Sequence, residues 1–501
     1  MKLSALILAL LAASCGGPPE PGASSGVSDA RSASAPPVSG AAVRLPVTEN
    51  DSLNPYKAKS KNNRELGLLL FDTLIALDEN FGIKYQLAES VEQDGKNLVI
   101  RLRGARFSDG SAVTAEDVTY SIAAAQKSET AGFAAQLSNI RSKNAASASV
   151  VTIALKKDDP NFARLLNFPV IKLNSDFRKD ADKKELPPIG GGRYVLEKAE
   201  NGLRLLANGS WRGEKPGIAN IELVSTPDQD SLNHQLLSGG IGVYYSDLSD
   251  GKFPVMNGAA ARVPQNNLVF LGVGLKAGPL TDPAVRSAVS EAVDRNELAA
   301  KAYATYALAA VGIFHPLWAA GTPTEILLAG SPKLNLAVAD LAKAGYNKKD
   351  SDGFYTRAGK RLTLKLLVNG ENAQRAAAAG QIRDSLAKCG VEVKVAQLAF
   401  AQYSAAISGG DYDLYLGEMR LLNNMDVSPL LPGGTQAAAA WAAYLGGDGT
   451  PGAFADLVNT ELPVIPLCYR SGILVSLSAF GGSLIPGATD LFYGLESVDL
   501  K

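Results

Sequence analysis

The stretch LAESVEQDGKNLVIRLRGARFSDGSAVTAEDVTYSI, residues 87–122, contains the local signals that decide the fold. Its middle part, residues 97–107, alternates apolar and polar side chains, which is typical of a half-buried strand. Asp109-Gly110 then predicts a turn, because glycine accepts a positive φ without steric cost. Thr114 follows as the expected N-cap of a helix with apolar residues at helical spacing. The stretch therefore predicts a strand, a turn and a capped helix.

Three acids in this stretch allow a second interpretation, an acidic catalytic or metal site. They are Asp109, Glu116 and Asp117. The local interpretation already explains them, because Asp109 belongs to the turn and the other two lie at the positive end of the helix dipole. We also expect the Thr114 hydroxyl to accept a hydrogen bond from the Asp117 N–H, as in a capping box. The turn and the capped helix are therefore favoured over a metal or catalytic site.

The composition excludes several classes of function. A chain of 501 residues is long enough for two or three domains with apolar cores of their own. A net charge of −1 gives no electrostatic argument for nucleic acid or for an anionic membrane surface. The two histidines, His234 and His315, lie far apart and lack partners for a metal centre or for a nucleophilic site. We expect no enzymatic activity, no metal and no cofactor.

The N-terminal residues are predicted to direct export. Lys2 precedes the apolar run LSALILALLAAS, which is too short to span a bilayer as a mature helix. Small residues come directly before Cys15, and the pattern resembles a bacterial lipoprotein signal, although Ala12 replaces the usual leucine. We expect a signal peptide over residues 1–14 and lipid on the Cys15 thiol; an ordinary signal peptide with an incidental cysteine is the alternative.

Residues 15–42 are rich in Gly, Pro, Ser and Ala and contain almost no large apolar side chain. Such a segment cannot bury a core and is expected to be a disordered tether. Signal, lipid and tether together predict an extracytoplasmic body anchored to the cell membrane.

The two remaining cysteines leave an alternative open. An exported protein can form disulfides. However, Cys389 precedes Gly390 at the end of a predicted helix, and Cys468 lies in the strand-like run PVIPLCY. Two separately buried thiols are at least as well supported as a bridge.

From Val43 onward, strand and helix patterns alternate and predict an α/β protein. Residues 187–211 are typical of a glycine-rich bend followed by a hairpin. Residues 266–275 are an apolar strand candidate for a crossing between lobes, and residues 282–304 predict one amphipathic helix. Further strands are expected at 150–157, 218–225, 391–398 and 463–476, and further helices at 228–240, 337–346 and 373–390.

These segments, in this order, resemble the extracytoplasmic solute-binding proteins of family 5, the oligopeptide, dipeptide and nickel receptors of ABC importers. The similarity is strongest in residues 87–122 and extends from Val43 to the C-terminus. It continues through LNPY (53–56), PLTDPAVRSAVSEAVDR (279–295), LAKAGYNKKDSDGFY (341–355) and GGDYDLYLG (409–417).

The resemblance implies an α/β, two-lobed fold of the periplasmic-binding-protein type II, with an extra subdomain on the N-terminal lobe and hinge strands between the lobes. Solute is enclosed between the lobes, and lobe closure is read by the membrane subunits of the importer. The implied division is lobe I at 43–56, 172–266 and 468–501, the subdomain at 57–171, and lobe II at 267–467.

One segment departs from the pattern of the peptide receptors. These proteins place an aspartate after the DYDLYLG-type strand, where it holds the free amino terminus of the ligand. Here the segment is GEMRLLNNMDVSP, and Asn423 stands at that place. Either Glu418 or Asp426 takes the role, or the ligand is not a peptide with a free amine.

Arg420, in the same segment, has the geometry to bind a carboxylate through two parallel hydrogen bonds. The alternative for Arg420 and Glu418 is a surface ion pair. The nickel receptors are a weaker match, because His234 falls in a predicted surface helix and His315 is a lone candidate.

We expect a receptor for a peptide or another small polar solute that works with an ABC permease and ATPase, as a monomer and without covalent chemistry. An exported hydrolase and a transport-decoupled lipoprotein receptor of the same fold are the alternatives. The candidate ligand-binding residues, chosen by motif position, are Asn54, Tyr56, Tyr245, Phe270, Glu418, Arg420, Asn423 and Asp426.

Overall fold

The computed structural model describes residues 43–128, 132–200, 202–255, 258–324, 330–477 and 484–495. The predicted signal peptide, Cys15 and the tether lie outside the described residues. Residues 41–501 form one unit, and its strands are arranged in several sheets.

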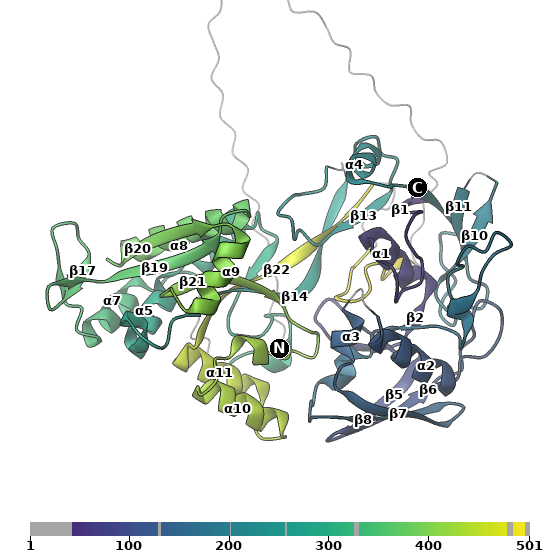
Figure 1. The fold of residues 1–501 in the computed structure, drawn as a ribbon, viewed down its shortest axis with the longest axis horizontal. Helices are drawn as coiled ribbons and strands as arrows, with labels where there is room; N and C mark the ends of the chain where they lie inside the picture. The colour runs from purple at the N-terminus through teal and green to yellow at the C-terminus, as the bar shows by residue number, and fades with distance from the viewer. Residues whose placement is uncertain are drawn as a thin grey trace, which may run out of the picture. The chain divides into compact units, whose positions relative to one another are not determined.

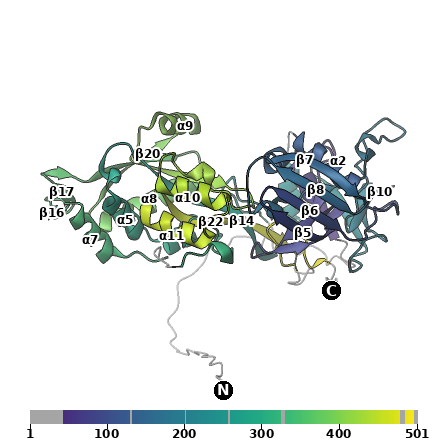
Figure 2. The same ribbon diagram turned by 90° about the horizontal axis from the view of Figure 1, so that it is seen from below.

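The opening stretch forms the elements that its local signals predict. Strand β6 (Asn97–Leu102) pairs antiparallel with β5 (Ala88–Asp94) and with β8 (Val150–Leu155), and β7 (Ile140–Ser147) completes a four-stranded sheet in the order β5-β6-β8-β7. Helix α2 (Ala115–Gln126) follows the turn. Figure 2 shows the four strands side by side. The predicted strand, turn and helix are confirmed.

The local structure accounts for Asp109, Glu116 and Asp117, the three acids that allowed an acidic site. Thr114 and Asp117 form the expected capping box, in which the Thr114 N–H donates to Asp117 Oδ2 at 2.8 Å. The second oxygen of Asp117 accepts from the Leu173 N–H at 2.8 Å. Asp109 pairs with Lys172 at 2.6 Å, and Glu116 is exposed. Within the described residues, no cluster of three His, Cys, Asp or Glu side chains could hold a metal ion.

A second four-stranded sheet has the order β1-β12-β11-β10. Strand β1 (Val43–Val47) is parallel to β12 (Asn220–Ser225), whereas β11 (Gly202–Ala207) is antiparallel to both of its neighbours. Strand β10 (Tyr194–Ala199) and β11 form the predicted hairpin.

The largest sheet is built on two long strands. Strand β14 (Ala259–Val273) pairs antiparallel with β22 (Val464–Ser476) along most of their length, and Figure 1 shows them side by side. At one end β22 pairs with β13 (Val243–Ser246). At the other end β14 pairs with β21 (Leu414–Arg420), which continues into β19 (Thr363–Asn369) and β20 (Glu392–Leu398). The predicted crossing strand is therefore the second half of β14.

Buried apolar side chains form two large cores. One contains the sheet of β5–β8 and α2 together with residues from 310–318 and 421–458, and the other contains buried apolar residues from 269–307 and 337–416. Helices around these cores are α1 (Lys61–Leu70), α5 (Pro283–Ala292), α7 (Leu334–Lys343), α8 (Ala373–Lys388), α9 (Phe400–Gly409), α10 (Gln436–Leu445) and α11 (Pro451–Glu461).

The shorter elements connect these parts. They are β2 (Asp72–Thr73), β3 (Ile75–Leu77), β4 (Ile83–Tyr85), α3 (Phe133–Gln136), β9 (Pro169–Val170), α4 (Gln229–Leu237), α6 (Arg295–Glu297), β15 (Ala307–Ala309), β16 (Lys348–Lys349), β17 (Tyr355–Arg357) and β18 (Lys360–Arg361).

The single helix predicted over residues 282–304 is wrong. Helix α5 ends at Ala292, and Asp294 caps a new short helix by accepting the Glu297 N–H at 2.8 Å. Arg295 explains the break, because its buried guanidinium donates to Ser290 O at 2.8 Å and to Pro466 O at 2.9 Å. A tertiary contact with β22 thus overrides the helical period.

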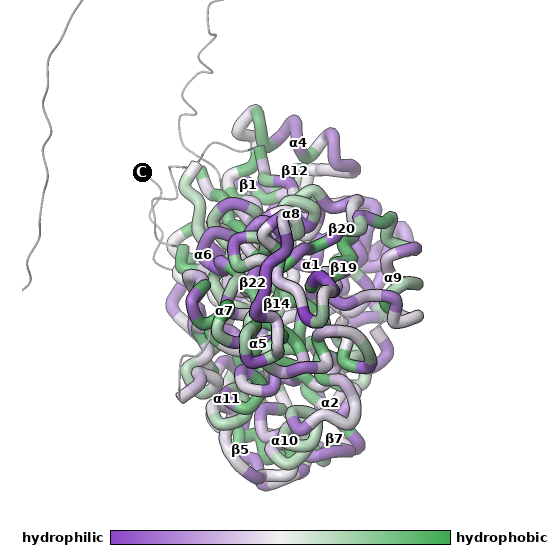
Figure 3. Tube along the Cα trace, turned by 90° about the vertical axis from the view of Figure 1, so that its left-hand side faces the viewer, coloured by the Kyte–Doolittle hydropathy of each residue, from purple (hydrophilic) through white to green (hydrophobic). Residues whose placement is uncertain are grey.

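The prediction about the two thiols has an outcome in the structure. Cys389 and Cys468 are both buried and unbridged, so the alternative of two separate thiols is confirmed. In the part of the chain that the structure describes, the helices are too short or too polar to cross a membrane. Figure 3 shows hydrophilic and hydrophobic stretches alternating along helices such as α4.

The glycine run before β10 is required by close backbone packing. A Cβ on Gly192 would lie 2.3 Å from Leu69 O and 2.4 Å from Leu70 C, at the end of α1. A Cβ on Gly190 would lie 2.1 Å from Leu70 O. The run therefore allows the chain to pass directly over the end of this helix.

We predict that Gly192→Ala lowers the free energy of unfolding by about 2–3 kcal/mol, because a backbone segment must move to admit the methyl group. Equilibrium urea unfolding measures this. The matched control is Gly380→Ala in α8, where no atom lies within 4 Å of the added Cβ. We expect this control to stabilise the protein by about 0.5–1 kcal/mol. Equal free energies of unfolding for the two variants would contradict the close approach of Gly192 to the end of α1.

Candidate functional site

Two adjoining cavities lie between helix α1 and the end of strand β21. The first has a volume of about 220 Å³ and the second about 600 Å³. Four residues line both cavities, namely Arg64, Leu68, Arg420 and Asn423. We call these two cavities together the α1 cleft.

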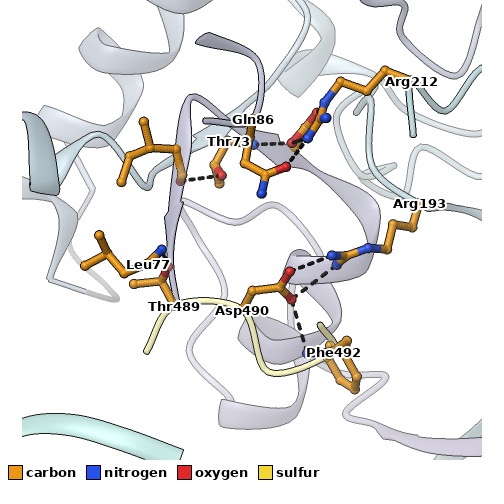
Figure 4. Close-up of polar contacts among 10 residues, drawn as sticks. Thr73, Leu77, Gln86, Arg193, Arg212, Thr489, Asp490 and Phe492 are labelled. Atoms are coloured by element: carbon orange, nitrogen blue, oxygen red, sulfur yellow. Dashed lines mark hydrogen bonds and ion pairs between the residues drawn. The ribbon is translucent and has the colours of Figure 1, made fainter. Parts of the chain in front are cut away.

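The wall of the first cavity contains two ion pairs, shown in Figure 4. The Arg193 guanidinium donates to both carboxylate oxygens of Asp490, at 3.2 and 2.5 Å, and both side chains are buried. Arg212 pairs with Asp72 at 2.6 Å and also donates to the Gln86 side chain. Both acids of this wall are therefore neutralised by arginine.

The second cavity has a mixed charge. Lys61 Nζ lies 4.0 Å from Asp247 Oδ1 and 4.6 Å from the centre of the Tyr245 ring. Glu65, one turn along α1, has a buried Oε1 without a hydrogen-bond partner in the described part of the chain. Burial, together with Asp247, raises the pKa of Glu65 to about 8, against the opposing effect of Lys61. Glu65 is therefore mainly protonated at neutral pH.

Two guanidinium groups remain at the junction of the cavities. Arg420 is exposed at the last position of β21, and among the described residues its side chain forms no hydrogen bond or ion pair. Against the opposing effect of burial, its charge and that of Lys61 help to lower the pKa of Asp247. Arg64 is exposed on α1, where its Nη1 donates to the backbone oxygen of Lys59 at 2.5 Å. Both exposed side chains line the two cavities and retain N–H donors, so the junction is a place where an anion can bind.

Three of the predicted ligand-binding residues line the α1 cleft. Arg420 and Asn423 line both cavities, and Tyr245 lines the second. The backbone oxygen of Asn423 accepts from Arg164 Nε at 3.0 Å, which holds this segment against the residues before β9.

Glu418 does not form the surface ion pair with Arg420 that was one alternative. Its side chain is 7% exposed and pairs with Arg470 at 2.6 Å and with Arg375 at 3.0 Å. A third hydrogen bond comes from Asn267 Nδ2 at 2.8 Å. Burial opposes ionisation of Glu418, but the two arginines outweigh it and hold its pKa below the usual value.

Four other predicted residues also have protein partners. Asp426 accepts from the Ser428 N–H at 2.9 Å and from Trp441 Nε1 at 3.1 Å. The other three are buried: Asn54 accepts from the Tyr56 N–H at 2.9 Å, the Tyr56 hydroxyl donates to Pro169 O, and Phe270 packs edge-on against Tyr415. Together with Glu418, these residues lie outside the linings of both cavities. As ligand contacts they stay predictions.

Sequence analysis did not identify the contribution of α1. Lys61, Arg64 and Glu65 occur within KNNRE, where charged residues at helical spacing are equally typical of a solvated helix face. Only their position next to β21 distinguishes them.

The two histidines offer no shared site. His315 is 1% exposed between the rings of Phe81 and Tyr469, and burial lowers its pKa to about 3. His234 lies on α4, in another part of the chain. His315 is therefore neutral and packed in the core.

A larger cavity of about 960 Å³ lies elsewhere, between residues 49–53 and the β10–β11 hairpin. None of the predicted ligand-binding residues lines it. Size alone favours this cavity, but the α1 cleft combines predicted residues with guanidinium groups that form no ion pair with a carboxylate of the described residues, so we take the α1 cleft as the candidate site.

Comparisons with known proteins agree with this architecture. A sequence profile described as bacterial extracellular solute-binding proteins, family 5 Middle, matches residues 82–435. The oligopeptide-binding protein AppA of Bacillus subtilis (strain 168) is 26% identical over 424 residues, which are 79% of this chain and 75% of that protein. The glutathione-binding protein GsiB of Escherichia coli O157:H7 is 25% identical over 386 residues, which are 72% of this chain and 69% of that protein.

The unliganded open form of MppA, a periplasmic murein tripeptide binding protein, has a similar fold. Its TM-score is 0.73 at 22% sequence identity, over 91% of this chain and 96% of that chain. At this identity the likeness concerns the fold.

We predict that Glu418→Gln lowers the free energy of unfolding by about 3–5 kcal/mol at pH 7, because it leaves two arginines beside a neutral amide. The folded pKa of Glu418 is depressed, so its contribution is complete above the unfolded value near 4.5 and is lost as the pH falls through the folded pKa. Urea unfolding should therefore show the difference between the variant and the wild type shrinking below pH 4.5.

The control is Asp384→Asn, which breaks a pair with Arg383 whose side chains are 51% and 61% exposed. We expect no measurable loss of stability from this substitution. A loss as large as that of Glu418→Gln would mean that burial does not set the strength of these pairs.

Proposed function

Because the chain belongs to the bacterial extracellular solute-binding proteins of family 5, we propose that it captures a peptide or a similar extended polar solute in the α1 cleft. It is the extracytoplasmic substrate-binding component of an ABC importer. In this proposal the loaded protein delivers its solute to the membrane permease and performs no covalent chemistry. Family membership favours this function over an exported hydrolase.

The observation that carries the choice of site is the junction of the two cavities. A helix residue, Arg64, and a strand residue, Arg420, line both cavities, and neither forms an ion pair with a carboxylate of the described chain. Solute pockets combine apolar walls with a few such convergent polar groups. Leu68 and Phe71 supply apolar surface in the same lining. The names of two relatives, an oligopeptide-binding and a glutathione-binding protein, support a peptide-like solute.

We further propose that solute is enclosed by closure of two lobes. Lobe I comprises residues 43–56, 172–266 and 468–501, with a subdomain at 57–171, and lobe II comprises 267–467. The pairing of β14 with β22, together with their different partners at the two ends, supports a hinge in these strands. The α1 cleft is lined from both sides of this division, by α1 and by residues 420–423.

We propose that lipid on Cys15 anchors the receptor to the cell membrane. Cys15→Ala should move the protein from the membrane fraction to the soluble extracytoplasmic fraction, because one thiol carries the anchor. Cell fractionation and the intact mass of the protein measure this. Cys389→Ala is the matched control and should stay in the membrane fraction, since Cys389 is buried. A Cys15→Ala protein that remains membrane-bound and keeps a lipid mass would contradict the anchor.

The exported Cys15→Ala protein also allows a direct test of the solute class. We expect native mass spectrometry of protein purified from rich medium to show a heterogeneous set of added peptide masses. These masses should disappear after unfolding and refolding and return when a peptide mixture is added. One discrete mass of a non-peptide solute would instead refute the peptide assignment while leaving the binding function intact.

A further inference from the structure

We propose that the solute carries a free carboxylate, that Arg64 and Arg420 hold this carboxylate together, and that a free ammonium group is not required. This inference rests on the proposed function, because it concerns the solute of the same cleft. It reverses the arrangement expected of a peptide receptor, in which an aspartate holds the amino terminus.

The position of the two arginines is the first support. Arg64 belongs to α1 and Arg420 ends β21, yet both line both cavities. A planar guanidinium binds a carboxylate through two parallel hydrogen bonds, and a second guanidinium can bind the remaining lone pairs. The two arginines come from elements far apart in the sequence, so a shared carboxylate would join α1 to β21.

The charge balance of the cleft is the second support. Asp72 and Asp490 are neutralised by arginine, and Asp247 lies beside Lys61. The remaining acid of the lining, Glu65, is mainly protonated at neutral pH because burial raises its pKa. In the described part of the chain, the charge left without a partner in the cleft is therefore positive and is carried by the two arginines.

The lack of an acid for an ammonium group is the third support. Asn423, at the expected position of the amine-binding aspartate, lines both cavities with a neutral side chain. The two acids that could replace it are already bonded elsewhere, Glu418 to two arginines and Asp426 to Ser428 and Trp441. The other acids of the described lining, Asp72, Asp490 and Asp247, already lie beside an arginine or a lysine, so an ammonium group would lose its water without gaining an unpaired carboxylate, which is unfavourable.

Four forms of tri-alanine test separately whether binding requires the carboxylate and whether it requires the ammonium group. They are the free peptide, the N-acetylated peptide, the C-terminal amide, and the doubly blocked peptide. Isothermal titration calorimetry with the Cys15→Ala protein, refolded empty, gives the affinity for each form. We expect the acetylated peptide to bind within about threefold of the free peptide, and both forms without a carboxylate to bind at least about tenfold more weakly.

Substitutions of the two arginines then test whether they cause the preference for a free carboxylate. Arg64→Gln and Arg420→Gln should each weaken the free and acetylated peptides by about tenfold or more. Neither substitution should change binding of the C-terminal amide by more than about twofold, which a general structural defect would not reproduce. The control is Arg383→Gln, an exposed arginine outside the cleft, and it should bind all four forms as the wild type does.

The outcomes distinguish this inference from the proposed function. Tight binding of the amide and loss of binding on acetylation would show an ammonium site, so the inference would fail while the peptide receptor stands. Failure of all four forms to bind would refute the peptide assignment. The chemical identity of the solutes that co-purify from rich medium would then decide whether the solute carries a carboxylate. A carboxylate-bearing solute that is absent from Arg420→Gln protein supports the inference, whereas a neutral or cationic solute retained by both variants overturns it.

Discussion

The buried cluster around Glu418 is the interaction on which the rest of the structure depends. Glu418 lies on β21 and binds Arg470 of β22, Arg375 of α8 and Asn267 of β14. A buried carboxylate requires partners with good geometry, because the cost of removing it from water is large. These partners are available only when the three strands keep their register, so the cluster ties the long strands β14 and β22 to the rest of the sheet.

The same strand also contributes to the binding site. Arg420 follows Glu418 by two residues, so both side chains lie on one face of β21. Glu418 is enclosed by its partners, whereas Arg420 reaches the α1 cleft at the end of the strand. Within one short strand, one charge stabilises the sheet and the next charge is available to a solute. A carboxylate held by Arg420 would thus be mechanically connected to the two long strands.

Much of the fold could be predicted because its signals are local. The capped helix after Thr114, the hairpin of β10 and β11, and the helix ending before Gly390 each depend on residues close in sequence. The prediction failed over residues 282–304, where Arg295 bonds to a carbonyl of β22. Helices α10 and α11 were not predicted. Of the site, Arg420, Asn423 and Tyr245 were identified by motif position, whereas Arg64 and Glu65 resembled an ordinary charged helix face.

The sequence by itself determined many of the strands and helices, the places of the two thiols at a helix end and in a strand, and the presence of an amide at position 423. Only the tertiary structure decided which charges are neutralised. Arg193 and Asp490 are separated by 297 positions, and Arg212 and Asp72 by 140, yet each pair removes an acid from the cleft. Hydrogen-bonded turns and helical periods act over a few residues and can be read from the chain. Charge pairing depends on distances that exist only after folding, so Arg64 could be recognised only in three dimensions, and only the fold shows that Arg420, a candidate from the sequence, forms no ion pair with a carboxylate of the described residues.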